Sequence, residues 1–256
     1  MQEIEMNWYT KRKILYSSIL IILIIGWFVF LLRGFIWAPA TCFDGKKNNI
    51  ETGIDCGGSC LLQCSTDYKP LSIAAARAIK TADKKYDVLV LVDNPNTSSA
   101  PMMLSLVVEL YDNNGKNFKT MRATVPGSTG YQIPVYNKSI VADNITNVIA
   151  RLEPYEMYKT RGSYDLKLKN FTYNKKDSST DINVFYSSPY SDDVSDNFVT
   201  MLVAYNSLGN AVGFYDFTVK GLKHDKLEEV FVSLPYRVEG DIASVKFIPL
   251  TLLYEK

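Results

Sequence analysis

The chain has 256 residues, with 28 Lys and Arg against 27 Asp and Glu, so its formal net charge at pH 7 is +1. A balance this even lacks the basic footprint of a nucleic-acid-binding protein. The single histidine, His224, lies in a polar stretch, and we expect it to be a solvated loop residue. Because general acid–base catalysis and imidazole metal sites usually require histidine, the composition also disfavours an enzyme.

An apolar run begins at Ile14 and ends at Leu32, and its 19 residues include no charged side chain. As a helix this run extends roughly 28 Å, close to the ~30 Å hydrocarbon core of a bilayer. A buried helix of a soluble protein is shorter on average and has a polar face. We therefore predict that residues 14–37 form a transmembrane anchor helix in contact with the lipid bilayer.

The flanks of the apolar run predict its orientation. Residues 11–13 are Lys-Arg-Lys, whereas Phe35 and Trp37 follow the run, which is the pattern of a basic cytoplasmic flank and an aromatic interfacial belt. Three basic residues at positions 33, 46 and 47 reduce the charge asymmetry. We expect a single-pass protein of the cell membrane, with residues 1–13 in the cytoplasm and the C-terminal domains outside it.

A cleaved signal peptide is the alternative to an anchor. Residues 38–40 are Ala-Pro-Ala, which loosely matches the small residues of a cleavage site. The apolar run is longer than the roughly 7 to 15 apolar residues of a signal sequence, so an uncleaved anchor is the preferred interpretation.

A cysteine-rich module is predicted over residues 38–67. Cys42, Cys56, Cys60 and Cys64 are the four cysteines of the chain. A segment this short cannot bury a core, so it needs disulfides or a metal, and two disulfides have three possible connectivities. Disulfides indicate an oxidising compartment. Zinc is the alternative, although the cysteine spacing does not match paired C-x-x-C knuckles.

Oxygen-bearing side chains recur in the same module. Asp44, Asn48, Glu51 and Asp55 alternate with glycines, and a hard cation such as calcium requires six to eight oxygen ligands on a tightly turning backbone. The spacing is not that of an EF-hand. The sequence therefore suggests calcium as a ligand of these residues, and a solvated loop rich in turn residues explains the same composition.

The pattern C-x-D-G-x-x-N-x-x-E-x-G-x-D-C-G-G-x-C, which runs from Cys42 to Cys60 and is followed by Cys64, resembles a known module. This small cysteine-rich module recurs in envelope and secreted proteins of bacteria and archaea. The resemblance covers about a tenth of the chain. It implies a surface location outside the cytoplasm and no fixed activity.

After residue 67 the apolar residues recur with a period of two, which is typical of strands. Strands are predicted near residues 86–92, 104–110, 118–125, 131–136 and 148–152. The turn at residues 112–115, Asp-Asn-Asn-Gly, predicts a hairpin after the second of these. The nearly continuous apolar run at 86–92 is typical of a well-buried strand.

The second half of the chain repeats the first. Residues 106–111 align with 200–205 at an offset of 94, and residues 150–154 align with 245–249 at an offset of 95. We therefore predict a mainly β fold with two tandem immunoglobulin-like β-sandwich domains, over residues 68–154 and 165–256, joined by a linker at 155–164.

Two turns resemble those of known sandwich families. Leu110, Tyr111 and Asp112, with Gly115, are similar to the turn of FxLYD domains, and the Asp-Asn-Pro-Asn turn at 93–96 is similar to that of the water-stress type. The second copy departs from the first pattern, because Ala204 and Asn206 replace the Leu and the Asp. The resemblance implies a sandwich fold and an envelope setting, with binding or scaffolding more usual than catalysis.

Candidate recognition residues lie in the second copy. Four tyrosines, at positions 173, 186, 190 and 205, could form a recognition surface, since tyrosine combines a large apolar face with a polar end. The loop at 187–193 could bind a ligand at the end of a sandwich. Ordinary strand composition and a hydrophilic loop explain the same features, and we prefer these explanations.

The resulting hypothesis is a membrane-anchored binding or scaffolding protein whose partner is a protein or an envelope polymer. The alternative is an accessory subunit of a membrane complex that assembles through its helix, with Ser17, Ser18 and Gly26 facing another helix. An enzyme that uses a metal bound to the acidic loop is the least favoured of the three hypotheses.

Overall fold

The computed structural model describes residues 7–36, 41–48, 51–224, 226–250 and 252–254. The fold is mainly β with one N-terminal helix, as the sequence predicted. The chain separates into two compact units, residues 1–55 and 56–256, which we describe one at a time. Trp37 and the small residues 38–40, which entered the predictions of orientation and cleavage, lie outside the described residues.

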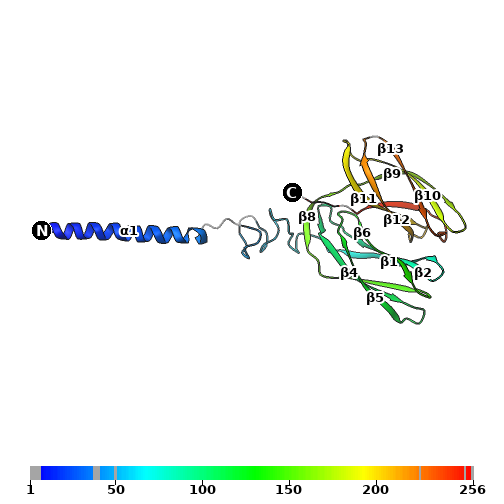
Figure 1. Cartoon of the computed structure of the whole chain (residues 1–256), viewed down its shortest axis with the longest axis horizontal. Helices are drawn as coiled ribbons and strands as arrows, with labels where there is room; N and C mark the ends of the chain where they lie inside the picture. Colours follow the sequence, from blue (N-terminus) through cyan, green and yellow to red (C-terminus); the bar gives the residue numbers. More distant parts are fainter. Residues whose placement is uncertain (1–6, 37–40, 49–50, 225, 251, 255–256) are drawn as a thin grey trace. The chain divides into compact units, whose positions relative to one another are not determined.

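The first unit contains the helix α1 (Trp8–Ile36), which is continuous over 29 residues (Figure 1). It begins six residues before the predicted start at Ile14 and includes the basic residues at 11–13. Arg12 lies over the ring of Trp8, with its guanidinium carbon 3.9 Å from the ring centroid. No described side chain of α1 is buried, and the segment from Trp8 to Arg33 is long and apolar enough to cross a membrane.

The second unit contains strands that pair antiparallel throughout. In chain order they are β1 (Ser72–Ala82), β2 (Lys85–Asp93), β3 (Ser99–Pro101), β4 (Met103–Tyr111), β5 (Asn117–Pro126), β6 (Gln132–Val141), β7 (Asn147–Leu152), β8 (Met157–Ser163), β9 (Lys167–Lys175), β10 (Thr180–Ser187), β11 (Val194–Tyr205), β12 (Ala211–Leu222), β13 (Leu227–Leu234), β14 (Ser244–Pro249) and β15 (Leu252–Tyr254).

In the first half of this unit, the sheets β1-β2-β6 and β5-β4-β7 enclose a core. The predicted strands at 86–92 and 104–110 are confirmed as the centres of β2 and β4. Side chains of β4 alternate between buried and half-buried, because Leu104, Leu106 and Leu110 point into the core. The predicted hairpin is also confirmed, and Gly115 adopts a φ of 71° in its turn.

In the second half, the sheets β13-β10-β9 and β12-β11-β14 enclose another core. Val184 of β10 and Leu202 of β11 are fully buried in it. Aromatic side chains fill the space between the sheets, and the rings of Tyr186 and Phe247 meet edge to face at 5.6 Å.

The sheet β1-β2-β6 is buried on both faces, so the two halves are packed together. Leu89 and Leu91 of β2 are 1% exposed and belong to the core of the second half, whereas their neighbour Val90 belongs to the core of the first. Tyr136 of β6 also packs against Phe214 of β12, with ring centroids 5.4 Å apart. The result is a stack of four sheets in which β1-β2-β6 and β12-β11-β14 are the inner layers (Figure 1).

The segment predicted to be a linker, residues 155–164, contains the strand β8. This strand pairs with β3 on one side and with β15 on the other. Met157 is fully buried, and the amide of Lys159 donates to the carbonyl of Leu61 at 2.8 Å. The connection between the halves is therefore a paired strand, because neighbouring segments satisfy its backbone groups.

Candidate functional site

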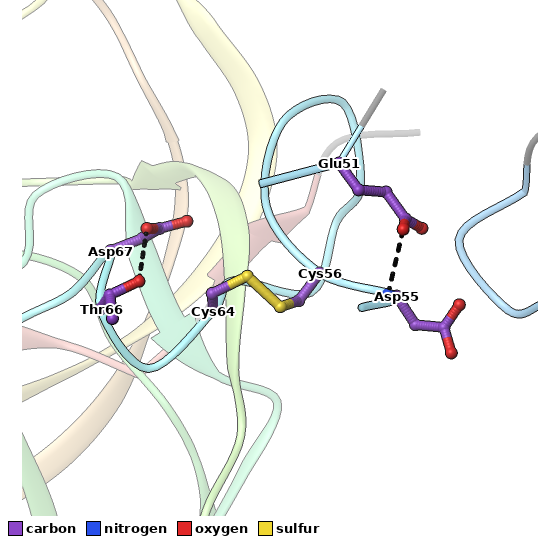
Figure 2. The surroundings of a disulfide bond; sticks show 6 residues. All are labelled: Glu51, Asp55, Cys56, Cys64, Thr66 and Asp67. Atoms are coloured by element: carbon purple, nitrogen blue, oxygen red, sulfur yellow. Dashed lines mark hydrogen bonds between the residues drawn. A yellow bond between two sulfur atoms is a disulfide. The ribbon is translucent and has the colours of Figure 1, made fainter. Parts of the chain in front are cut away.

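The cysteine-rich module is stabilised by disulfides, as predicted. All four cysteines are disulfide-bonded, and Cys56 pairs with Cys64 across a Cα–Cα distance of 5.0 Å (Figure 2). Their thiols are therefore not available as the thiolate ligands that a zinc site requires. The module continues into the second unit, where the amide of Gln63 donates to the carbonyl of Met157 at 2.8 Å.

The structure brings together the four residues proposed as calcium ligands. The Asp55 carboxylate accepts hydrogen bonds from the backbone N–H groups of Asp44 and Gly45, at 2.9 and 3.0 Å. The amide of Asn48 donates to the Asp44 carboxylate at 2.8 Å. The backbone N–H of Asp55 in turn donates to the Glu51 carboxylate at 3.2 Å (Figure 2).

These hydrogen bonds give the acidic side chains a structural role. Carboxylates that accept backbone N–H groups can fix a turning loop without a metal, as side chains do in Asx-turns. The positive φ of 55° at Asp55 shows how tightly this backbone turns. The same oxygens are of the type that calcium prefers, so calcium remains a prediction from the sequence.

The loop at 187–193, a candidate ligand-binding loop, is held by contacts with both neighbouring segments. The backbone N–H of Asp165 donates to the Tyr190 hydroxyl at 2.7 Å, and the Tyr164 ring meets the Tyr190 ring edge to face at 6.1 Å. Burial raises the pKa of the Tyr190 hydroxyl. His224 is exposed, as predicted, and its backbone N–H donates to the Asp193 carboxylate at 2.7 Å.

Two of the four candidate recognition tyrosines are not on the surface. Tyr186 and Tyr205 are 6% and 8% exposed because their rings fill the core of the second half. The Tyr205 hydroxyl donates to the side-chain oxygen of Gln132 at 3.2 Å, and burial raises its pKa to about 12. Tyr173 is 36% exposed and remains accessible. The preferred explanation, ordinary strand composition, therefore accounts for these two residues.

A cavity of about 220 Å³ lies between the two halves. Its lining includes Arg77 from β1, Asn210 from the β11–β12 turn, and Arg237 and Glu239 from the segment after β13. The Arg77 guanidinium donates to the Asn210 side chain. Sequence reasoning could not find this cavity because residues more than 100 positions apart form it.

Asn94 is buried, and its side chain makes several hydrogen bonds, whereas the sequence indicated only that it is part of a turn. Its side-chain amide donates to the carbonyls of Ser99 and Ser128, at 2.9 and 2.6 Å. Its side-chain oxygen accepts the backbone N–H of Asn96 at 3.0 Å. The Asp-Asn-Pro-Asn turn at 93–96 is therefore hydrogen-bonded to the start of β3 and to the segment between β5 and β6.

No known protein family matches this chain, and no curated protein does. Among solved structures, the chain is similar to the transglutaminase of red sea bream, with 15% sequence identity and a TM-score of 0.22. The similarity covers 74% of this chain and 29% of the transglutaminase chain, so this chain spans less than a third of that enzyme's length. A TM-score this low supports no inference about fold or activity.

Proposed function

We propose that this chain is a single-pass membrane protein that presents its β unit outside the cytoplasm for binding or scaffolding. One observation supports the anchor most strongly. The helix α1 is 29 residues long, none of its described side chains is buried, and no charge occurs between Ile14 and Leu32. A helix that is apolar all round requires apolar surroundings, and the β unit has cores of its own.

The disulfides and the basic flank support the same orientation. The disulfide between Cys56 and Cys64 favours an oxidising compartment for the C-terminal side. The Lys-Arg-Lys cluster at 11–13 favours a cytoplasmic N-terminus. The redox state of the cysteines and the charge of the N-terminal flank are independent properties, and both favour this orientation.

We also propose that the two halves are copies of one immunoglobulin-like sandwich. The sheet orders support this proposal, because β1-β2-β6 corresponds to β9-β10-β13 and β5-β4-β7 corresponds to β12-β11-β14. The hairpins correspond at an offset of 94, since Tyr111 pairs with Asn117 and Tyr205 pairs with Ala211. The last strands correspond at an offset of 97 by their pairing register, two more than the sequence alignment gave.

A binding role is the function that this architecture favours. Sandwich units outside a membrane present loops and strand edges to partners, which we expect to be proteins or envelope polymers. The only histidine of the sequence, His224, is exposed, and its Nδ1 atom lies 2.8 Å from the backbone carbonyl oxygen of Tyr190. Catalysis remains the least favoured hypothesis.

Labelling of two engineered cysteines in the full-length chain tests the topology. Because the native cysteines are all disulfide-bonded, a membrane-impermeant maleimide reports on Thr10→Cys or Leu208→Cys alone. Leu208 is 81% exposed in the β11–β12 turn. We expect intact cells to label Leu208→Cys, and Thr10→Cys to be labelled only after lysis. The reverse pattern, or an intact mass that lacks the N-terminal segment, would contradict the proposal.

Assembly through the helix remains the second candidate. An added Cβ at Gly26 would meet no described atom within 4 Å, so another helix could approach closely there. The Ser18 hydroxyl already donates to the carbonyl of Ile14 at 2.8 Å, which makes it a poorer donor to a partner. Replacing α1 with an unrelated anchor discriminates the two functions: presentation should survive the exchange, and assembly through the helix should fail.

A further inference from the structure

The cavity between the two halves has a lining with an excess of positive charge. Arg77, Lys80 and Arg237 contribute three cations to it, whereas Glu239 is the one acidic residue among the described residues of the lining. Asn210 adds a side-chain amide. The four charged residues are exposed, so solvent reaches the cavity along their side chains. The net positive charge of the lining favours an anionic ligand.

Arg77 is held at this cavity by a neutral partner. Its guanidinium donates to the side-chain oxygen of Asn210, a contact that joins the first half to the second. Arg77 forms no ion pair with a described residue, whereas Arg122 of the outer strand β5 pairs with Glu153 at 2.6 Å. An amide oxygen orients a guanidinium without neutralising it. Arg77 therefore keeps its charge and most of its N–H donors for a ligand.

Arg237 is the second guanidinium of the lining, and its own ion pair is weak. Its Nη1 lies 4.0 Å from the carboxylate of Asp177, a side chain that is fully exposed to solvent. An exposed pair at this distance contributes little to stability. The same Nη1 donates to the carbonyl of Lys176 at 3.5 Å, which is a long hydrogen bond. An anion in the cavity can therefore attract Arg237 away from these partners at little cost.

The uncharged part of the lining provides space and a hydroxyl group. Tyr236 is 4% exposed, and its hydroxyl makes no well-aligned hydrogen bond with a described group. A buried hydroxyl of this kind favours a ligand or water that satisfies it. Ala78 and Ala211 have small side chains, and the cavity volume of about 220 Å³ corresponds to about seven waters at roughly 30 Å³ each. One sugar ring occupies a similar space.

We propose that this cavity binds one carboxylate-bearing sugar unit of an envelope polymer. Arg77 and Arg237 bind the carboxylate, because a guanidinium offers it two parallel N–H groups. The sugar hydroxyls donate to the Glu239 carboxylate and accept from the Asn210 amide. One acidic residue among three basic ones suits such a ligand, since it accepts hydrogen bonds from hydroxyls and leaves the cavity positive.

This inference deepens the proposed binding role and rests on it for the choice of an envelope polymer. The lining favours a polymer over a protein, because none of its large apolar side chains is exposed and protein partners usually insert apolar or aromatic anchors. A phosphate group also binds guanidiniums, and the titration below separates the two anions.

Calorimetric titration of the detergent-solubilised full-length chain tests the proposal. The probes are trigalacturonate, which has carboxylates, the uncharged maltotriose, and inorganic phosphate. We expect trigalacturonate to bind, more weakly as the salt concentration rises, and maltotriose not to bind. Equal binding of the two oligosaccharides, binding of phosphate without trigalacturonate, or no binding of trigalacturonate at millimolar concentrations would overturn the proposal.

Substitutions of matched arginines locate the site. Arg77→Gln removes the charge, so we expect the affinity for trigalacturonate to fall at least about tenfold, as the loss of a charge-assisted hydrogen bond predicts. Arg237→Gln should also weaken binding, whereas Arg122→Gln should leave it unchanged. Thermal unfolding followed by circular dichroism verifies that each variant is folded.

Unchanged affinity in both Arg77→Gln and Arg237→Gln, or an equal loss in Arg122→Gln, would refute the site. Titration in detergent does not depend on membrane topology, which the maleimide experiment tests separately. Failure of the sugar site and failure of the proposed membrane topology are therefore distinguishable.

Discussion

The packing of the two halves against each other predicts that Leu91→Ala destabilises the whole β unit. Leu91 lies on the face of β2 that an isolated first sandwich would expose to water, yet it is 1% exposed and belongs to the core of the second half. Truncation of a buried leucine costs about 2–5 kcal/mol, through lost burial and the cavity left behind. Substitution of a surface leucine changes stability by less than about 0.5 kcal/mol.

Two leucines of the same chain bracket this expectation. Leu106 is fully buried in the first core alone, and Leu208 is 81% exposed. We expect the free energy of unfolding of Leu91→Ala to fall as far as that of Leu106→Ala, while Leu208→Ala stays near the unmodified chain. Urea unfolding followed by circular dichroism measures this, since every tryptophan precedes residue 38 and cannot report on the β unit.

Hydrogen exchange followed by mass spectrometry locates the effect. If the halves unfold as one unit, Leu91→Ala should accelerate exchange in β11 and β12 as well as in β2, because a shared core couples them. If Leu91→Ala lowers the free energy of unfolding by less than about 0.5 kcal/mol, or if hydrogen exchange is faster only in β1–β7, the shared core is refuted. The halves would then behave as two domains joined by a linker.

Three further predictions concern single sites. Asn94→Ala should lower the free energy of unfolding in urea by about 2–5 kcal/mol, because two buried carbonyls lose their hydrogen-bond donor. Asn94→Asp should lower it further at neutral pH, because a carboxylate oxygen would then face the same two carbonyls. Equal losses in the two variants would contradict the hydrogen-bond assignment. Replacing Cys56 and Cys64 with alanine should lower the free energy of unfolding by roughly 2–3 kcal/mol, because the short loop that the disulfide closes gains chain entropy in the unfolded state. Thermal unfolding measures this loss, and a variant as stable as the unmodified chain would refute the prediction. Burial raises the pKa of Tyr205 from 10.0 to about 12, so its contribution to stability should be complete below pH 10 and be lost as the pH rises toward 12, by roughly 2–3 kcal/mol. Alkaline unfolding of Tyr205→Phe should lack this loss, and an identical pH profile would contradict it.

The features that the sequence predicted correctly depend on local patterns. An apolar run of 19 residues predicts a helix whatever follows it, and the alternation in β4 predicts a strand with one buried face. The turn at 112–115 follows from the positive φ that Gly115 adopts readily. The four cysteines predict disulfides because so short a segment cannot form a core.

The features that the sequence did not predict depend on contacts between distant segments. Residues 155–164 have the composition of a linker, and β8 exists there because β3 and β15 supply partners from residues far away in the chain. In the same way, Tyr186 and Tyr205 are surface candidates by composition, and only packing across the sandwich shows that they are buried. The local sequence of an irregular segment does not show which distant segment it will pair with.

The arrangement of the four sheets was nevertheless encoded in the sequence, in the difference between the halves. If the halves are copies of one domain, as proposed, then at an offset of 94 Glu109 on the outward face of β4 corresponds to Val203 of β11, which is fully buried. Conversely, Leu89, buried between the halves, corresponds to Asn183 on the outward face of β10. Under the proposed correspondence, each half has apolar residues in place of polar ones on a different sheet, as expected when β1-β2-β6 of the first half and β12-β11-β14 of the second half form the shared interface. Comparison of corresponding positions, rather than the similarity between the halves, identifies the faces that meet.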